Sequence, residues 1–253
     1  MGNPQHFSRD LPQRCQQLLR DLYFDLPHRE GSGPVPLKLK ATFLLAISMP
    51  MINLPLERIN KYRDDGQAKR PAAEHMNDFQ LDPRVADAVK LVIDENTLLK
   101  DAPFFSAGAW RYHELAKGNG FPNLAKDGLP KDIAEKLRHN SAEAGNVVST
   151  KLFCEILRNS LAHGGVLFLN EQGESSYGDP VRKFAFVSTK GMNNPSALHI
   201  LRIGMKEYRT FLNKWAAWLK KSGVQKQLET SVEGEATEMT DDKAALAMAV
   251  AAG

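Results

Sequence analysis

The chain has 253 residues, of which 42% are hydrophobic and 25% are charged, and its formal net charge is +3. These values are ordinary for a globular protein and exclude a collagen-like, low-complexity or highly charged disordered chain. It has only two cysteines, and no metal-ligand spacing surrounds them, which argues against a disulfide framework and a zinc site, so we expect a reducing, cytoplasmic environment.

The N-terminus lacks the apolar stretch of a signal peptide. The most apolar run, from Phe43 to Leu56, is too short to cross a bilayer and contains Pro50 and Pro55. We therefore interpret this run as part of the core, and we expect no membrane partner.

Apolar residues recur at helical spacing in several segments of the N-terminal half. The predicted helices are residues 10–26, 37–48, 56–64 and 82–99. The stretches between them are polar and contain Pro or Gly, so residues 28–36 and 66–81 are predicted to be loops.

The C-terminal half predicts a central helix, a hairpin and a last helix. The central helix, residues 146–162, is apolar over more than half its circumference and ends at Gly164-Gly165, a strong stop signal. Two short apolar runs around turn residues then predict a β-hairpin. The other predicted elements are a helix at residues 130–143, strands at residues 166–169 and 183–187, and a last helix at residues 195–221.

These elements predict a mainly all-α fold with one short β-hairpin before the last helix. We expect a single helical domain over residues 1–222. Residues 223–253 are acidic and then Ala-rich, and we predict a disordered tail because they offer little apolar surface to bury. From Lys226 onward the net charge is −4, which leaves +7 for the rest of the chain, and a moderately basic body suits a nucleic-acid partner.

One segment carries residues suited to phosphate chemistry, because Arg158 and His163 lie five positions apart at the end of the central helix. An Arg can clamp a phosphodiester and stabilise the charge that develops on it. A His titrates near neutral pH and can transfer a proton. Together they would let a 2′-hydroxyl attack its own phosphodiester without a metal or other cofactor. We therefore predict catalytic roles for Arg158 and His163, a supporting role for Asn159, and no cofactor.

The same residues have a structural alternative. Cations in the last turn of a helix stabilise its dipole, so Arg158 and His163 could be capping residues and nothing more. Spacing alone carries little weight, since Arg70 and His75 are also five positions apart and no apolar helix leads into them. Ser160 is interpreted as a helix-end residue rather than a nucleophile, because no second His or acid is spaced to serve it.

Two further groups of residues are weaker candidates. Trp110, Arg111, Tyr112 and His113 form an aromatic-basic cluster that could stack on bases, although loop aromatics are more often local core. His199 falls on the predicted last helix, and we interpret it as structural.

The segment LFCEILRNSLAHGGVLFL resembles the signature of the HEPN superfamily. That signature is an Arg, a polar residue directly after it, and a His four to six positions from the Arg at the end of a buried helix. Arg158, Asn159 and His163 match all three features. The Gly-Gly and the apolar strand after the His are similar to a group of HEPN proteins found on bacterial plasmids, and the helical run from Phe43 to Ile59 also fits that group.

The resemblance implies an α-helical bundle and a homodimer, with a composite cleft where the motifs of two subunits meet. Many such proteins are metal-independent endoribonucleases in toxin or phage-defence systems, so it implies RNA as the partner, together with an antitoxin or defence-system protein. Other members are catalytically silent modules that bind nucleotide or RNA, or only mediate dimerisation. Some HEPN toxins carry a Tyr two residues after the His, which a nucleotidyltransferase modifies. Gly165 stands there in this chain, which argues against that route of neutralisation.

Overall fold

The computed structural model describes residues 7–26, 39–59, 88–118, 120–175, 179–189 and 196–222. Its labelled helices are α1 (Phe7–Leu22), α2 (Leu39–Ser48), α3 (Leu54–Ile59), α7 (Leu124–Asp127), α8 (Lys131–Lys136) and α9 (Thr150–His163). A π-turn (Met49–Asn53) joins α2 to α3, and residues 205–222 form a C-terminal helix. Short 3₁₀ turns span Leu99–Asp101, Asn140–Ala142 and Ala144–Asn146. The strands are β1 (Trp110–Ala116), β2 (Val166–Leu169), β3 (Lys183–Thr189) and β4 (Ala197–Gly204).

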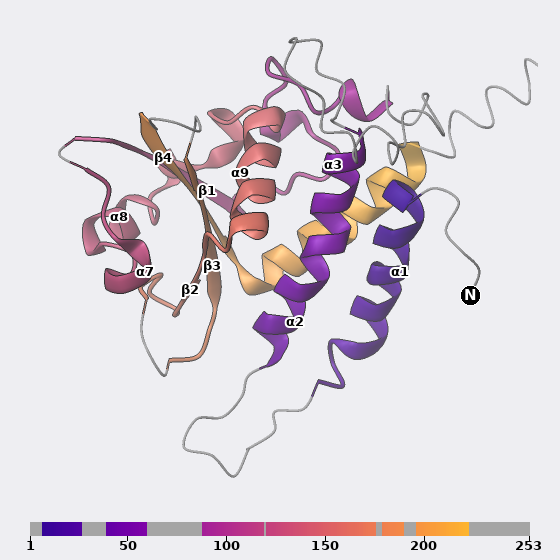
Figure 1. Ribbon diagram of the computed structural model, residues 1–253, viewed down its shortest axis with the longest axis horizontal. Helices are drawn as coiled ribbons and strands as arrows, with labels where there is room; N and C mark the ends of the chain where they lie inside the picture. The colour runs from indigo at the N-terminus through magenta and orange to yellow at the C-terminus, as the bar shows by residue number, and fades with distance from the viewer. Residues whose placement is uncertain are drawn as a thin grey trace, which may run out of the picture.

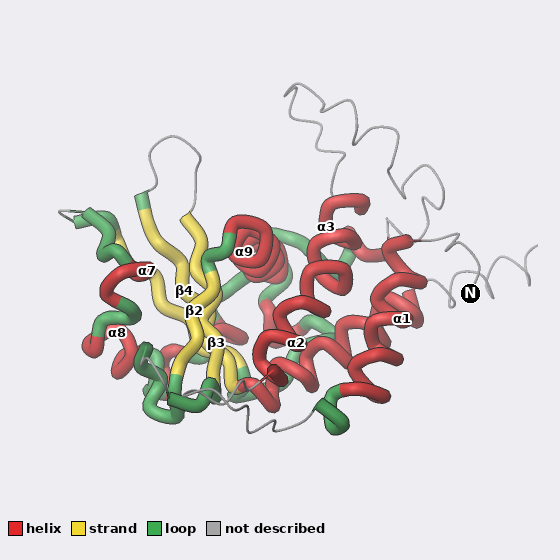
Figure 2. The backbone as a smooth tube through the Cα atoms, turned by 60° about the horizontal axis from the view of Figure 1, so that its bottom comes forward, coloured by secondary structure: helices red, strands yellow, loops and turns green. Residues whose placement is uncertain are grey.

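The four strands form one antiparallel sheet in the order β1-β4-β3-β2. Figures 1 and 2 show the sheet between two groups of helices, with α7 and α8 on one side and α9 on the other. Beyond α9 lie the segment formed by α2 and α3 and then α1, while the C-terminal helix runs from the sheet toward α1. α9 is therefore an inner layer of the molecule.

The fold is mixed α and β, so the prediction of a mainly all-α fold is wrong. The predicted hairpin exists, since β2 and β3 pair antiparallel directly after α9. It is, however, only half of the sheet. The other half is β1, which lies where no helix or strand was predicted, and β4, which lies in the region predicted to be helix.

The predicted last helix is a strand followed by a helix. Leu198 and Leu201 are spaced like residues on one helical face, and this spacing is the reason that a helix was predicted here. In the structure β4 pairs with β3 and β1 on its two edges, and all of its residues except Gly204 are buried. A central strand that is covered on both faces is almost continuously apolar, and such a run has no clear period of two.

The apolar run after residue 38 is one bent helix rather than two separate helices. Pro50 has no N–H to donate, and its ring would clash with a carbonyl one turn earlier in a regular α-helix. The wider π-turn keeps the chain helical through this residue. The Nε1–H of Trp215 donates to the carbonyl of Met51 in that turn at 2.7 Å, which ties the bend to the C-terminal helix.

By length and composition alone, Leu39–Arg58 is the one helix in the described ranges that could cross a membrane. Half (50%) of its most apolar 18-residue window is buried inside the molecule, as in the core helix of a globular protein. Pro50 and Pro55 therefore do not interrupt this helical stretch, contrary to the expectation from the sequence.

The remaining predicted helices differ from the observed ones mainly in length. The first and central helices are confirmed as α1 and α9, with shifted ends. The helix predicted at residues 82–99 is helical only at residues 88–90 within its described part, and the one predicted at residues 130–143 shortens to α8. The predicted loops at residues 28–36 and 66–81, the Arg70–His75 pair and the tail beyond residue 222 lie outside the described residues.

The sheet separates two apolar clusters. The larger one lies on the α9 side and contains Trp110, Phe153, Phe186, Leu201 and Tyr208 at its centre. The smaller one lies under α8 and includes Ile133, Ala185 and Ile200. Both free cysteines, Cys15 and Cys154, are buried in the larger cluster, and burial raises the pKa of each thiol.

Ile200 distinguishes the strand from the helix predicted for this segment. In β4 it is 0% exposed within the smaller cluster, whereas on the predicted helix it would lie outside the stripe formed by Leu198 and Leu201. We predict that Ile200→Ala lowers the free energy of unfolding by about 2–5 kcal/mol, the usual cost of truncating a buried aliphatic side chain. Leu91→Ala, at a side chain that is 75% exposed, should change it little. Urea denaturation of both variants checks this, and equal small effects would contradict the assignment of β4.

Candidate functional site

The site is built on the C-terminal end of α9. The helix begins at Ser149, whose side chain accepts a hydrogen bond from the N–H of Leu152, and ends at Gly164, which adopts the left-handed conformation with φ 72°. The N–H of Gly165 also donates to the carbonyl of Ser160 at 2.8 Å, which closes the last turn. The helix stop predicted at Gly164-Gly165 is therefore confirmed.

Gly165 fixes how the helix end meets the sheet. A Cβ atom at this position would lie 2.3 Å from the carbonyl oxygen of Val187, so a side chain has no room there. The N–H of Val187 donates to the carbonyl of Gly165 at 2.7 Å. The absence of a Tyr two positions after His163 thus has a steric reason, because the backbone at Gly165 packs directly against β3.

Arg158 is held by two neighbouring side chains. Its Nε and Nη2 atoms donate to Oδ1 of Asn159 at 3.1 and 2.7 Å. Its Nη1 atom lies 3.2 Å from Oε1 of Glu57 on α3, and the two side chains are 36% and 38% exposed. A guanidinium has five N–H donors, and these contacts use three of them. Two donors of a fixed cation are left for an anion, as far as the described residues show.

Asn159 connects Arg158 to the sheet. Its Nδ2 atom donates to Oγ of Ser188 on β3 at 3.3 Å, while its Oδ1 atom accepts from the guanidinium. The polar residue directly after the Arg therefore orients the guanidinium through its own anchor on a rigid strand. This geometry is compatible with the supporting role predicted for Asn159.

The bent helix supports the site from the other side. The Nδ2 atom of Asn53, in the π-turn, donates to the backbone carbonyl of Arg158 at 3.3 Å. One turn further on, Glu57 reaches the guanidinium of the same residue. Neither residue could be recognised from the sequence, because both precede Arg158 by about a hundred positions and no local pattern marks them.

The positions on α9 determine which side chains can act together. At about 100° per residue, Arg158, Ala162, Asn159 and His163 follow one another around an arc of about 140°. All four are partly or fully exposed, whereas Ser160 and Leu161 on the remaining side are buried. Ala162 is small and lies between Arg158 and His163, so the arc has room for a ligand that touches both.

His163 is the last residue of α9 and is exposed. No hydrogen bond or ion pair joins its ring to another residue of the described ranges, and none joins it to Arg158. The structure thus brings Arg158 and Asn159 into contact, and it places His163 on the same arc without contact.

Ser160 is buried, and its hydroxyl donates to the carbonyls of Ile156 and Leu157 at 2.7 and 3.0 Å. This supports the interpretation of Ser160 as a helix-end residue. Within the described ranges no group of three or more His, Cys, Asp or Glu side chains gathers in a way that could hold a metal ion.

The aromatic-basic cluster and His199 both lie on strands. Trp110 is 1% exposed in the larger core, so it cannot stack on a base. The hydroxyl of Tyr112 lies 2.8 Å from Nδ1 of the buried His199 on β4. Burial, and then Glu114, raise the pKa of the Tyr112 hydroxyl. His199 is thus a packed residue of the sheet, not of a helix.

The comparisons with known proteins agree with the motif. The sequence model of the family described as HEPN pEK499 p136 matches residues 1–226. No curated protein and no solved structure is similar enough to the chain to match.

Proposed function

The chain belongs to the HEPN pEK499 p136 family, and on this premise we propose that it is a metal-independent endoribonuclease that uses Arg158 and His163. The observation that supports this most is the open arc at the end of α9, with a fixed guanidinium on one side and a free imidazole on the other. A phosphodiester seated over Ala162 would reach both groups.

In the proposed reaction the 2′-oxygen of the RNA forms a bond to phosphorus, and the bond from phosphorus to the 5′-oxygen breaks. Arg158 stabilises the negative charge that builds up on the phosphoryl oxygens, using its two remaining N–H donors. His163 transfers a proton between the attacking or leaving oxygen and solvent. The products are a 2′,3′-cyclic phosphate and a 5′-hydroxyl. Such an activity fits a role in a bacterial toxin or phage-defence system, with an antitoxin or other defence protein as a further partner.

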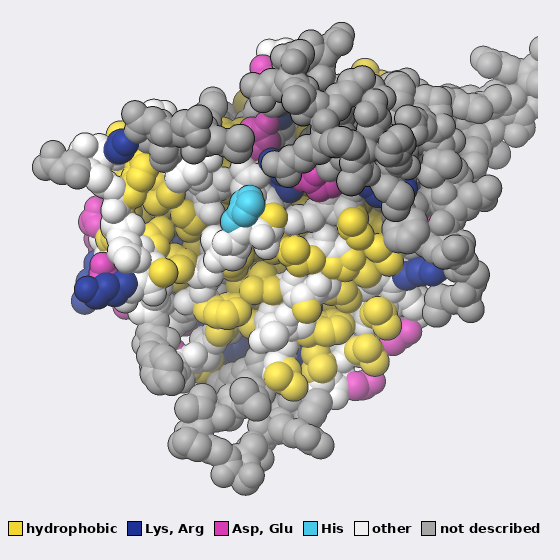
Figure 3. Space-filling model, in the orientation of Figure 1, with side chains coloured by type: hydrophobic (Ala, Val, Ile, Leu, Met, Phe, Trp, Pro, Cys, Tyr) yellow, Lys and Arg dark blue, Asp and Glu magenta, His cyan; other side chains and the backbone are white. Residues whose placement is uncertain are grey.

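We also propose that the protein acts as a cytoplasmic homodimer, in which the C-terminal ends of two α9 helices form one cleft. Figure 3 shows hydrophobic side chains, with few charges among them, over the face on which α2 and α9 lie in Figure 1. Met49 and Phe168, on elements next to α9, are 40% and 44% exposed. Glu57 beside each Arg158 would reduce the repulsion between two guanidinium groups in such a cleft.

The dimer predicts a mass twice that of the chain at micromolar concentration. Light scattering coupled to size-exclusion chromatography measures it directly. Met49→Lys combined with Phe168→Lys should shift the protein toward the monomer, because charges in an apolar interface are costly to bury. As a control, Leu91→Lys alters an exposed apolar residue that belongs to neither α2 nor α9. A monomeric wild-type protein would rule out the composite cleft.

We predict that Arg158→Ala and His163→Ala each abolish RNA cleavage without unfolding the protein. Loss of an acid-base group typically costs about 10²–10⁴-fold in rate, and loss of a fixed charge donor a comparable factor. Their contribution to helix capping is only about 0.3–1 kcal/mol each. The assay is incubation of each protein with RNA in chelator, with thermal melting as the stability control. Expression of the wild type, but not of either variant, should slow bacterial growth.

Arg70→Ala and Ser160→Ala provide the controls, and both should cleave RNA at close to the wild-type rate. Equal slow degradation by the wild type and by both site variants would remove the enzyme proposal. The alternative would then be a non-catalytic HEPN module that binds nucleotide or RNA, or that only mediates dimerisation. Cleavage that chelator stops would leave a nuclease but contradict the metal-free mechanism.

Glu57 gives a prediction that a purely structural motif does not share. Glu57→Gln removes a carboxylate 3.2 Å from Arg158 while keeping the size of the side chain. The RNA phosphate then no longer competes with a neighbouring anion, so we expect tighter binding of RNA in a His163→Ala background. Asp101→Asn removes one exposed negative charge elsewhere and should change binding little. Filter binding at fixed salt measures both, and an equal change in the two variants would show only an effect of net charge.

A further inference from the structure

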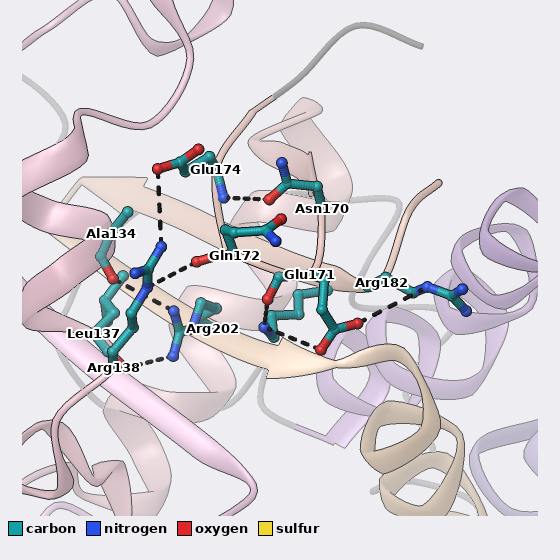
Figure 4. A network of polar contacts seen from close by, with 10 residues as sticks. Ala134, Leu137, Arg138, Asn170, Glu171, Gln172, Glu174, Arg182 and Arg202 are labelled. Atoms are coloured by element: carbon teal, nitrogen blue, oxygen red, sulfur yellow. Dashed lines mark hydrogen bonds and ion pairs between the residues drawn. The ribbon is translucent and has the colours of Figure 1, made fainter. Parts of the chain in front are cut away.

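Basic side chains gather on the face of the sheet that is opposite α9. Arg111 on β1 and Arg202 on β4 are direct partners in the antiparallel register, so their side chains leave the same face. Lys183 on β3 lies on this face as well, because it is two residues from Ala185, the other partner of Arg202. Arg138, just after α8, reaches the same place from the α8 side of the sheet (Figure 4).

Arg202 is a fixed cation that has no acidic partner among the described residues. It is 7% exposed, and its Nη2 and Nη1 atoms donate to the carbonyls of Leu137 and Ala134 at 2.5 and 3.5 Å. Within the described ranges no carboxylate oxygen lies within 4.0 Å of its guanidinium. The turn between β2 and β3 closes over it at Gly173, where a Cβ atom would lie 2.7 Å from Nη1. Figure 4 shows this turn and Arg138 around the Arg202 side chain.

The guanidinium of Arg111 also lacks part of its hydrogen bonding among the described residues. Its Nη2 atom donates to Oδ1 of Asn140 at 3.5 Å, the limit of a hydrogen bond. Its Nη1 atom is buried and has no hydrogen-bond partner among the described residues. A buried donor that lacks an acceptor is energetically unfavourable, so a bound anion that accepts this hydrogen bond would stabilise the cluster.

The nearby carboxylates form ion pairs with the cations at the edge of the cluster. Oε1 of Glu174 lies 3.8 Å from Nη2 of Arg138, and Glu171 contacts Arg182 and Lys183 at 3.9 and 3.8 Å (Figure 4). Three guanidinium groups thus stand close together, and among the described residues Glu174 is the one carboxylate within 4.0 Å of any of them. Burial, followed by the charges of Arg111 and Arg138, lowers the pKa of Arg202 to about 10.

We propose that Arg111, Arg138 and Arg202 form a phosphate-binding subsite that holds the RNA backbone away from the bond that is cut. This inference rests on the proposed function, because it names a second contact for the same substrate. Arg202 is set in place by the carbonyls at the end of α8, while Arg138, whose side chain is 42% exposed, and the partly exposed Arg111 meet the ligand. Guanidinium groups suit this task because they bind phosphate oxygens in pairs. The subsite lies on the other face of the sheet from Arg158, so a bound strand would pass around the sheet or along a partner subunit.

The test compares the double variant Arg111→Gln, Arg138→Gln with the control Lys100→Gln, Lys220→Gln. Both lose two positive charges, and the control residues are exposed and do not belong to the cluster. The probe is a short, single-stranded 2′-O-methyl oligonucleotide, which has no free 2′-hydroxyl and cannot be cleaved by the proposed route. Its affinity is measured by fluorescence anisotropy over a series of salt concentrations. For the cluster variant, the slope of log affinity against log salt should fall by about 1.4, since each phosphate contact on a single strand contributes about 0.7.

The control variant should keep most of the wild-type slope, and Arg111→Lys with Arg138→Lys should restore much of it. Equal slopes for the cluster and control variants would overturn the subsite. A second outcome would also overturn the RNA subsite: inorganic phosphate stabilises the wild type but not the cluster variant, while both bind the oligonucleotide equally. The cluster would then bind a free phosphate compound rather than RNA. Because the probe is not cut, the binding test can succeed or fail independently of the cleavage assay. Thermal melting of the cluster variant excludes unfolding as the cause of a changed slope.

Discussion

The burial of α9 between the sheet and the bent helix of residues 39–59 is the constraint on which the rest of the site depends. Phe153, Ile156 and Leu157 fill the larger core from this helix. Packing on both sides leaves only one arc at the C-terminal end open, and that arc carries Arg158 and His163. The apolar circumference of α9 is therefore explained within one chain and does not by itself require a second subunit.

The parts of the site that depend on neighbouring residues could be predicted from the sequence. Gly164 and the N–H of Gly165 act through bonds within a few positions, so the abrupt end of α9 follows from local rules. The hairpin of β2 and β3 follows from short apolar runs around a turn. The pairing of Arg158 with Asn159 is likewise a contact between adjacent residues.

The parts that depend on long-range packing could not be predicted in this way. β4 is apolar on both faces because two other strands and two cores cover it, and those partners are not visible in its own sequence. β1 carries polar residues on both faces, Arg111 and His113 on one and Glu114 on the other, so its sequence shows no clear apolar alternation. Glu57 reaches Arg158 only because the π-turn carries the helix past Pro50. Each of these features is set by tertiary contacts, which override local spacing.

The central claim is that the arc of α9 performs metal-free cleavage by the neighbouring 2′-hydroxyl, and the ends of the RNA fragments test it most directly. Fragments made by the wild-type protein in chelator should carry a 2′,3′-cyclic phosphate on the upstream piece and a 5′-hydroxyl on the downstream piece, as mass spectrometry can establish. The same fragments should be missing from a reaction with His163→Ala. Fragments that carry a 3′-hydroxyl and a 5′-phosphate would show that water or a metal-bound hydroxide attacks instead, and they would contradict the account.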